Sequence, residues 1–356
     1  MEKFKGYWSN VGTWLKNQTI TPRFNSIKAS LTSIGFGILF GIVLLFLLKP
    51  ADAFGGFISM LVTGFSSADK FGKLLYTATP LIMTGLGVAF AFKTGLFNIG
   101  ASGQYLMGAF FALFTAIIWQ FPWYLAIISA AIGGAIWGAI PGIFKALLNV
   151  NEVITSIMFN WIGLFLVNLL IYNTPKMIAT YYGASTGDRT ANLQQANPDA
   201  IIPTLGLDKI FSSNMNISIF IAIGIAILVY IILNRTIFGY ELKAVGLSRD
   251  ASKYAGINEK RSIIYAMMIS GALAGIGGGL YYLSGVATYT ILKLLQPMGF
   301  NGIPVALLAS SDPIGVIFSA LFISYLQVGG EAMQPEFAPE VVNIVISVII
   351  YTSAFS

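Results

Sequence analysis

Long apolar stretches alternate with short polar ones along nearly the whole chain. A helix that crosses the bilayer core needs about 20 mostly apolar residues. The sequence therefore predicts an all-α polytopic membrane protein with about ten transmembrane helices, some of them short or broken. The predicted spans are 31–48, 77–92, 98–119, 124–148, 152–173, 216–234, 262–284, 299–311, 313–329 and 341–355.

The basic residues predict how these spans are oriented. Residues 1–30 carry five Lys or Arg, and residues 235–262 carry six, of the 20 in the chain. Because cytoplasmic loops are enriched in Lys and Arg, we expect both segments in the cytoplasm. With ten crossings both termini are then cytoplasmic, which requires 299–311 to cross by itself. The expected organisation is a cytoplasmic N-terminal arm, 1–30, and one transmembrane domain, 31–356.

The segment 174–215 falls on the external side in this topology. It is rich in Asn, Thr, Pro and Asp, and it contains no apolar run that could cross a membrane. Long loops without regular structure are commonly either mobile or functional. Two interpretations stay open: a disordered surface loop, or a docking surface for an external protein.

Composition supports the membrane assignment and excludes several classes of function. Only 10% of the 356 residues are charged, whereas soluble domains have about 25%. The absence of His and Cys excludes imidazole bases, thiolate nucleophiles, disulfides and most transition-metal sites. The phosphate loop G-x-x-x-x-G-K-[ST] is also absent, so we expect no metal, no cofactor and no ATP bound in that way. The net charge of +6 comes from membrane edges, which argues against a nucleic-acid partner.

Glycines recur four residues apart on two predicted spans. One series is Gly134, Gly138 and Gly142, and the other is Gly271, Gly275 and Gly279. Small residues at this spacing let helix backbones approach closely in lipid. The run GIGGG at 275–279 follows an apolar helix and not a strand, so we interpret it as helix packing and not as a dinucleotide fingerprint.

Uncharged polar residues gather in two apolar regions, GLFNIGASGQYLMGAF at 95–110 and NVNEVITSIMFNWIG at 149–163. Pro80 and a series of glycines, Gly85, Gly87, Gly95, Gly100 and Gly103, should weaken or interrupt the helices there. The polar side chains either line a path for a neutral, hydrogen-bonding substrate or bind neighbouring helices. Glu152 starts a span, where capping or dipole neutralisation is the favoured role. The candidate pathway residues are Asn98, Ser102, Gln104, Thr155, Asn160 and Asn301.

The cytoplasmic segment 235–262 contains the sequence ELKAVGLSRDASKYAGI, which predicts two short helices with a break near Gly246. The second helix alternates small residues with charged ones. A solvated loop needs no face of small residues, whereas a loop that inserts into a groove on a partner does. The candidate docking residues are Leu242, Ala244, Gly246, Arg249, Asp250, Ala251, Ala255 and Gly256.

Three stretches, GLFNIGASGQ at 95–104, LKAVGLSRDASKYAGI at 242–257 and SGALAGIGGG at 270–279, resemble permease subunits of bacterial ABC importers of the branched-chain amino acid and ribose type. The resemblance covers the chain from about residue 35 to its end. Two more stretches, NVNEVITSIMFNWI and GFNGIPVALLASSDPIG, are similar to the branch that imports nucleosides, guanosine-type purine nucleosides in particular.

This resemblance implies a permease domain over 31–356 that imports nucleosides by ATP-driven alternating access, in a bacterial plasma membrane. It implies a second, different permease chain and an external substrate-binding lipoprotein. Two cytoplasmic ATPase subunits would bind the ATP and dock on 235–262. Two alternatives within the family are a permease for a monosaccharide and one for a branched-chain amino acid. An ion-coupled secondary transporter is less favoured, since it would need intramembrane acids or histidines, and an enzyme would lack catalytic groups.

Overall fold

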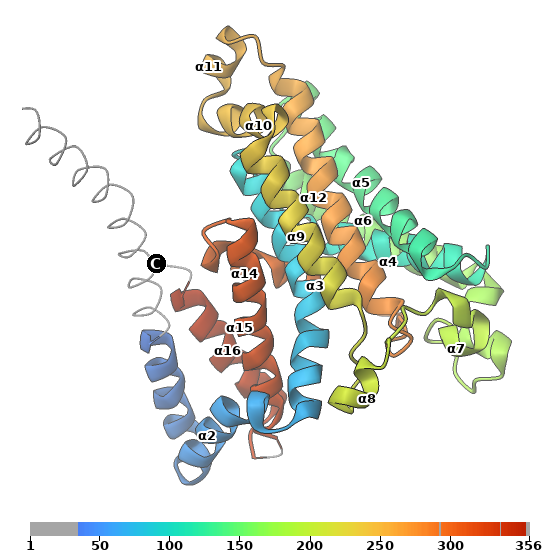
Figure 1. Cartoon of the computed structure of the whole chain (residues 1–356), viewed down its shortest axis with the longest axis vertical. Coiled ribbons are helices and arrows are strands. Elements are labelled where there is room, and N and C mark those ends of the chain that lie inside the picture. Colours follow the sequence, from blue (N-terminus) through green and yellow to red (C-terminus); the bar gives the residue numbers. More distant parts are fainter. Residues whose placement is uncertain (1–34, 292, 335, 354–356) are drawn as a thin grey trace, which may run out of the picture. The chain divides into compact units, whose positions relative to one another are not determined.

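The computed structural model describes residues 35–291, 293–334 and 336–353, and this part of the chain is built from helices and loops with two isolated β-bridges (Figure 1). The predicted arm, 1–30, lies outside the described residues. A first helix spans Gly35–Leu48. The others are α2 Pro50–Ser66, α3 Ala68–Lys93, α4 Ala101–Ile117, α5 Trp123–Leu148, α6 Glu152–Tyr172, η1 Pro175–Met177, η2 Ala179–Tyr182, α7 Leu193–Ala196, η3 Pro198–Ala200, α8 Leu207–Phe211, α9 Ser218–Arg235, α10 Ile237–Leu247, α11 Arg249–Tyr254, α12 Glu259–Tyr282, α13 Pro297–Phe300, α14 Gly302–Leu308, α15 Pro313–Glu331 and α16 Pro339–Ser353.

Six of the described helices are long and apolar enough to cross a membrane: α3, α5, α6, α9, α12 and α15. Shorter apolar helices lie at Gly35–Leu48, at α4, at Pro297–Leu308 and at Pro339–Val348. The predicted class, an all-α polytopic membrane protein, is confirmed for the described chain. Every predicted span contains a helix, but the structure does not confirm the count of ten or the location of the termini.

Two segments differ from the predicted spans. Helix α2 occupies 17 residues that the sequence pattern left between spans, and it begins with Pro50 in its first turn, a position that suits proline because its missing N–H needs no partner there. The segment 299–311 contains the end of α13, a helix of 4 residues, and the whole of α14, a helix of 7. Neither approaches the roughly 20 residues that a spanning helix needs.

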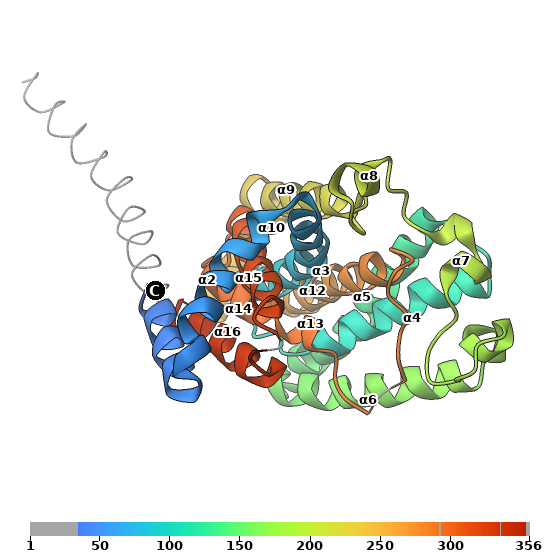
Figure 2. The same cartoon turned by 90° about the horizontal axis from the view of Figure 1, so that it is seen from below.

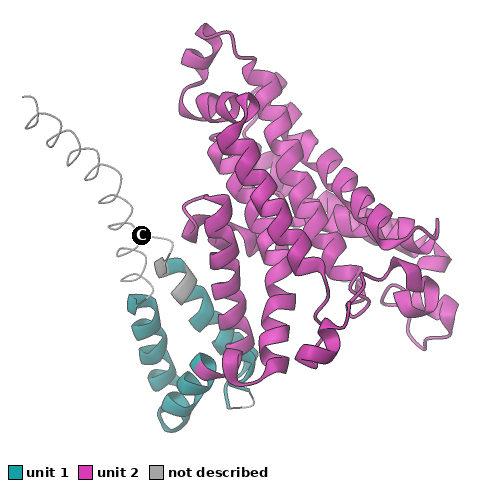
Figure 3. Cartoon of the chain, in the orientation of Figure 1, with its two compact units in different colours: residues 1–61, 330–356 teal, residues 62–329 magenta. Residues whose placement is uncertain are grey.

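The chain falls into two compact units, one made of the described parts of residues 1–61 and 330–356 and the other of residues 62–329 (Figure 3). In the smaller unit, Lys49 Nζ donates to the carbonyl oxygen of Glu336 over 2.6 Å. Phe337 is buried there and lies against Gly56, where an added Cβ would be 2.7 Å from the ring. All the candidate site residues belong to the larger unit.

The core of the larger unit is α12, which packs against α3, α4 and α5 (Figure 2). The glycine series predicted to mediate packing form this contact. A Cβ at Gly271 would lie 2.9 Å from the Cα of Gly138, and one at Gly275 would lie 2.9 Å from the Cα of Gly134. Real Cβ atoms do not approach so closely, so the two backbones touch only because these positions are glycine. The packing interpretation of 275–279 is therefore confirmed.

Helix α3 runs unbroken for 26 residues through Pro80, Gly85 and Gly87. Thr84 Oγ1 donates to the carbonyl oxygen of Pro80 over 3.0 Å. At Gly87 an added Cβ would lie 2.7 Å from the Ser270 carbonyl oxygen. Glycine is therefore needed here because α3 packs closely against α12. The expected interruption is thus confined to 94–100, between α3 and α4.

The segment 174–215 has defined local structure, which disfavours the disordered loop, one of the two interpretations left open. It contains η1, η2, α7, η3 and α8. Isolated bridges pair Ile178 with Thr190 and Arg189 with Thr290. Asn197 Nδ2 donates to the carbonyl oxygen of Ala116 over 2.8 Å, which fastens the segment to the C-terminal end of α4.

Candidate functional site

In the break between α3 and α4, backbone N–H and carbonyl groups lack the hydrogen-bond partners that a continuous helix would give them. Thr94 ends α3, with its Oγ1 donating to the Ala91 carbonyl oxygen over 2.7 Å. Gly95 then takes a φ of +69°, in the left-handed region that favours glycine. The chain re-enters a helix at Ala101. At membrane depth such a break is stable only when neighbouring protein groups or water satisfy its polar atoms.

Three side chains form a buried clasp across this break: Asn98, Gln104 and Ser270, each at most 1% exposed. Asn98 Nδ2 donates to Gln104 Oε1 over 2.7 Å and to Ser270 Oγ over 2.6 Å. Ser270 Oγ donates in turn to the Gly87 carbonyl oxygen over 2.6 Å. The clasp therefore joins the break to both α3 and α12.

Two more of the predicted pathway residues hold the break from other elements. Asn160, on α6, accepts from the N–H of Gly103 over 2.8 Å and donates to the carbonyl oxygen of Ile99 over 3.0 Å. Ser102 Oγ donates to the carbonyl oxygen of Gln296 over 3.0 Å. The structure thus brings Asn98, Ser102, Gln104 and Asn160 together, and the hydrogen bonds they make are to protein groups.

The remaining pathway candidates lie outside this group. Thr155 is buried, and its Oγ1 donates to the Asn151 carbonyl oxygen one turn back in the chain over 3.0 Å. Asn301 is half-buried between α13 and α14. Ser156, beside Gly100, is fully buried, and its hydroxyl has no hydrogen-bond partner among the described residues. The role of the six candidates in substrate passage stays a prediction.

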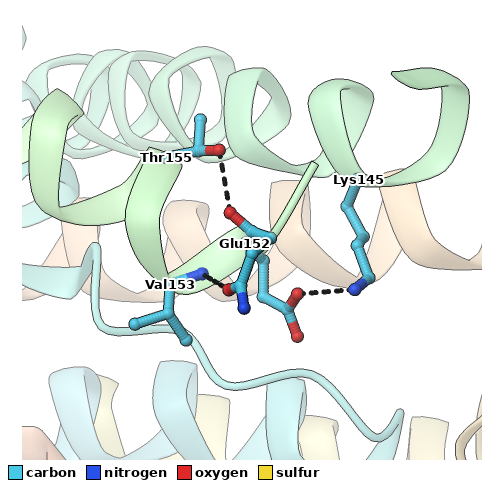
Figure 4. Close-up of polar contacts among 5 residues, drawn as sticks. Lys145, Glu152, Val153 and Thr155 are labelled. Carbon is cyan, nitrogen blue, oxygen red and sulfur yellow. Dashed lines mark hydrogen bonds and ion pairs between the residues drawn. The ribbon is translucent and has the colours of Figure 1, made fainter. Parts of the chain in front are cut away.

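Glu152 makes an ion pair at the start of α6. Its Oε2 lies 2.8 Å from Nζ of Lys145, in the last turn of α5 (Figure 4). The helix cap itself is Asn151, whose side chain accepts from the N–H of Val153 over 2.8 Å. A carboxylate in the first turn also suits the positive end of the helix dipole. The geometry agrees with a structural role for Glu152 in joining α5 to α6.

The segment 235–262 forms the two predicted helices, α10 and α11, which lie together at one end of the larger unit (Figure 1). The break between them falls at Ser248, two residues after Gly246, because Ser248 caps α11 by accepting from the N–H of Ala251. Gly246 itself lies inside α10.

Gly246 packs against the break between α3 and α4. A Cβ at Gly246 would lie 2.8 Å from the Lys93 carbonyl oxygen and 2.9 Å from the Gly95 nitrogen. A Cβ at Gly95 would lie 2.9 Å from the Gly246 carbonyl oxygen. These two glycines let α10 touch the start of the polar break, so a displacement of α10 acts directly on it.

The predicted docking residues divide into an inward group and an outward group. Leu242 is fully buried, and Ala244, Gly246 and Arg249 are half-buried. Asp250, Ala251, Ala255 and Gly256 are exposed. The sequence analysis missed two apolar side chains on the same surface, Leu247 at 90% and Tyr254 at 94% exposure. Both could have been found in the sequence as bulky apolar residues within a charged segment.

Comparison with known families matches residues 71–354 to the family described as branched-chain amino acid transport system / permease component. The chain is 38% identical over 335 residues to the nucleoside ABC transporter permease protein NupB of Lactococcus lactis, covering 91% of this chain and 90% of the relative. It is 38% identical over 323 residues to the guanosine ABC transporter permease protein NupP of Bacillus subtilis, covering 85% and 89%.

A third relative differs in the substrate that its name gives. The glucose ABC transporter permease protein TsgB13 of Haloferax volcanii is 27% identical over 320 residues, covering 86% of this chain and 81% of the relative. No solved structure matches the chain.

Proposed function

The chain belongs to the branched-chain amino acid transport permease family and is a multi-pass membrane permease subunit of an ABC transporter, not an enzyme; we propose that it imports nucleosides, and purine nucleosides in particular. The observation that carries this proposal is the pair of relatives at 38% identity, each covering at least 85% of the chain, that are named for nucleoside and guanosine transport. The relative named for glucose stands at 27% identity.

ATP would drive the import from a separate subunit. We place the docking of two ATPase subunits on α10 and α11, where Leu247, Tyr254 and Ala251 are exposed. Charged residues beside them, Asp250 and Lys253, would supply specificity. The contact of Gly246 with Gly95 gives a direct route from this surface to the polar break.

The topology that fits this function has an even number of crossings, with both termini and the α10–α11 pair in the cytoplasm of a bacterium and the chain in its plasma membrane. The basic residues of 1–30 and 235–262 support this orientation. A second, different permease chain would complete the channel. An external lipoprotein would deliver substrate to the ordered segment 174–215, on the other side.

The test is uptake of labelled guanosine and uridine by cells that express the complete importer, compared with a deletion strain, with ribose and leucine as controls. We expect the deletion to abolish ATP-dependent guanosine uptake and to leave leucine uptake unchanged. Loss of ribose or leucine uptake alone would show that the substrate assignment is wrong. A monosaccharide is the second candidate because of the glucose-transport relative, so labelled glucose belongs in the same assay.

A further inference from the structure

Five tyrosines from separate parts of the larger unit meet in one group, here called the tyrosine cluster: Tyr76 of α3, Tyr105 of α4, Tyr281 and Tyr282 of α12, and Tyr289 after α12. Ring centroids are 5.9 Å apart between Tyr76 and Tyr281 and 5.1 Å apart between Tyr281 and Tyr282. Tyr282 lies 6.5 Å from Tyr105 and 6.0 Å from Tyr289. The interplanar angles of these ring pairs range from 32° to 85°, so the pairs are tilted or edge-on and not stacked in parallel.

The cluster lies at the end of α12 that is remote from α10 and α11 (Figure 1). A helix of 24 residues is about 36 Å long, so the cluster and the cytoplasmic helices are at opposite ends of the protein core. Tyr105 follows Gln104 of the clasp directly in the sequence. Tyr289 exchanges hydrogen bonds with Thr190, which connects the cluster to the segment 174–215.

The hydroxyl of Tyr105 distinguishes the tyrosine cluster from an ordinary apolar core. Tyr105 is 1% exposed, and its hydroxyl has no hydrogen-bond partner in the described structure. By contrast, Tyr76 shares a hydrogen bond with Ser284 over 3.1 Å, and Tyr289 donates to Asn168 Oδ1 over 2.6 Å. A buried hydroxyl without a partner lowers stability, and phenylalanine would fill the same space without this cost. The hydroxyl therefore calls for a partner that comes from outside the chain.

The helices that carry Tyr105, Tyr281 and Tyr282 place no charged residue beside them. Helix α4 has no acidic or basic residue, and those of α12 are Glu259, Lys260 and Arg261 at its other end. The segment 283–291 has none either, whereas Lys73 lies one turn before Tyr76 on α3 and Arg189 is bridged to Thr290. Burial also raises the pKa of Tyr289, so that its hydroxyl stays protonated. A group of aromatic rings with neutral hydroxyls suits a neutral planar ligand better than the paired charges of an amino acid.

We propose that the tyrosine cluster holds the base of the transported nucleoside, which lies against the tyrosine rings while the Tyr105 hydroxyl hydrogen-bonds to its edge. This inference rests on the proposed function. Stacking of a base on an aromatic side chain tolerates different bases, because every base has a π-face. The free hydroxyl adds the directional contact that a ring face lacks. The position next to the clasp places the base at the entrance to the polar break.

The experiment compares Tyr105→Phe with Tyr124→Phe in the complete importer, since Tyr124 is a half-exposed tyrosine on α5 outside the cluster. We expect Tyr105→Phe to raise the KM for guanosine uptake by about three- to tenfold, the usual range for one lost hydrogen bond. The maximal rate and the recovery of the complex should not change, and thermal stability should be equal or higher. Tyr124→Phe should match the wild type in every measurement.

A wild-type KM in Tyr105→Phe would overturn the inference while leaving nucleoside import by the wild type intact. Lower thermal stability and poor complex recovery as its main effects would also overturn it, because they would assign the hydroxyl a structural role. A wild-type importer that takes up no nucleoside would instead refute the proposed function. As a second measurement, a photoreactive azido-purine nucleoside should label peptides that contain Tyr105 or residues 281–289, and labelling confined to other peptides would contradict the site.

Discussion

Single residues decide how closely α10 approaches the polar break between α3 and α4. Gly95 and Gly246 come within contact distance only because neither has a side chain, and Gly95 also needs its positive φ. The sequence analysis predicted Gly246 as a docking residue, which stays a prediction; in the structure Gly246 also packs against Lys93 and Gly95. A substitution there therefore tests the internal contact first and the docking surface only indirectly.

Gly246→Ala should destabilise the purified protein, because the new Cβ would lie 2.8 Å from the Lys93 carbonyl oxygen. Overpacking of this kind typically costs about 1–3 kcal/mol. The matched control is Gly224→Ala in α9, where no atom lies within 4 Å of the added Cβ, so a neutral or stabilising effect of up to about 1 kcal/mol is expected. Thermal unfolding in detergent measures both, and equal melting temperatures would show that the glycine contact is not needed.

At the scale of elements, α10 and α11 form a pair with an inner and an outer side. Leu242 and Val245 point into the protein, while Leu247 and Tyr254 are almost fully exposed. Large exposed apolar side chains within a charged surface commonly mark a protein interface. The helical spacing in the sequence predicted both helices, but it did not reveal which residues point outward.

Leu247→Glu and Tyr254→Glu should each reduce co-purification with the ATPase subunit by at least about tenfold, as expected when a buried interface residue is replaced by a charge. Ile210→Glu is the matched control, since Ile210 is also an exposed apolar residue, at 68%, but lies on α8 in the segment 174–215. All three variants should insert into the membrane at wild-type levels. Full recovery of the ATPase with both loop variants would refute docking at this surface.

At the scale of the whole molecule, the proposed topology separates two functional ends. The pair α10–α11 would lie in the cytoplasm, and the segment 174–215 would lie outside. The chain has no cysteine, so a single introduced thiol can be labelled without background. This property makes the orientation of each end directly measurable in cells.

A membrane-impermeant maleimide should label Ser185→Cys in intact cells, or in spheroplasts if an outer membrane is present, because Ser185 is exposed in the segment 174–215. It should label Lys253→Cys, exposed on α11, only after the membrane is permeabilised. The unsubstituted chain serves as the unlabelled control. The reverse labelling pattern would show that the orientation is opposite to the one proposed. Docking of cytoplasmic ATPase subunits on α10–α11 would then be refuted.

The sequence by itself determined the helical membrane class, the positions of most helices, the glycine packing faces and the family, because hydrophobic length, residue spacing and local motifs are properties of neighbouring positions. It predicted that Asn98 and Gln104 are important but left their partners open. It missed α2, and it predicted one span at 299–311, where the structure has two short helices. Only the tertiary structure paired Asn98 with Ser270, Gly95 with Gly246, and Tyr105 with Tyr282. These partners come from different helices, and which helix faces lie together depends on packing in three dimensions, which no local pattern records.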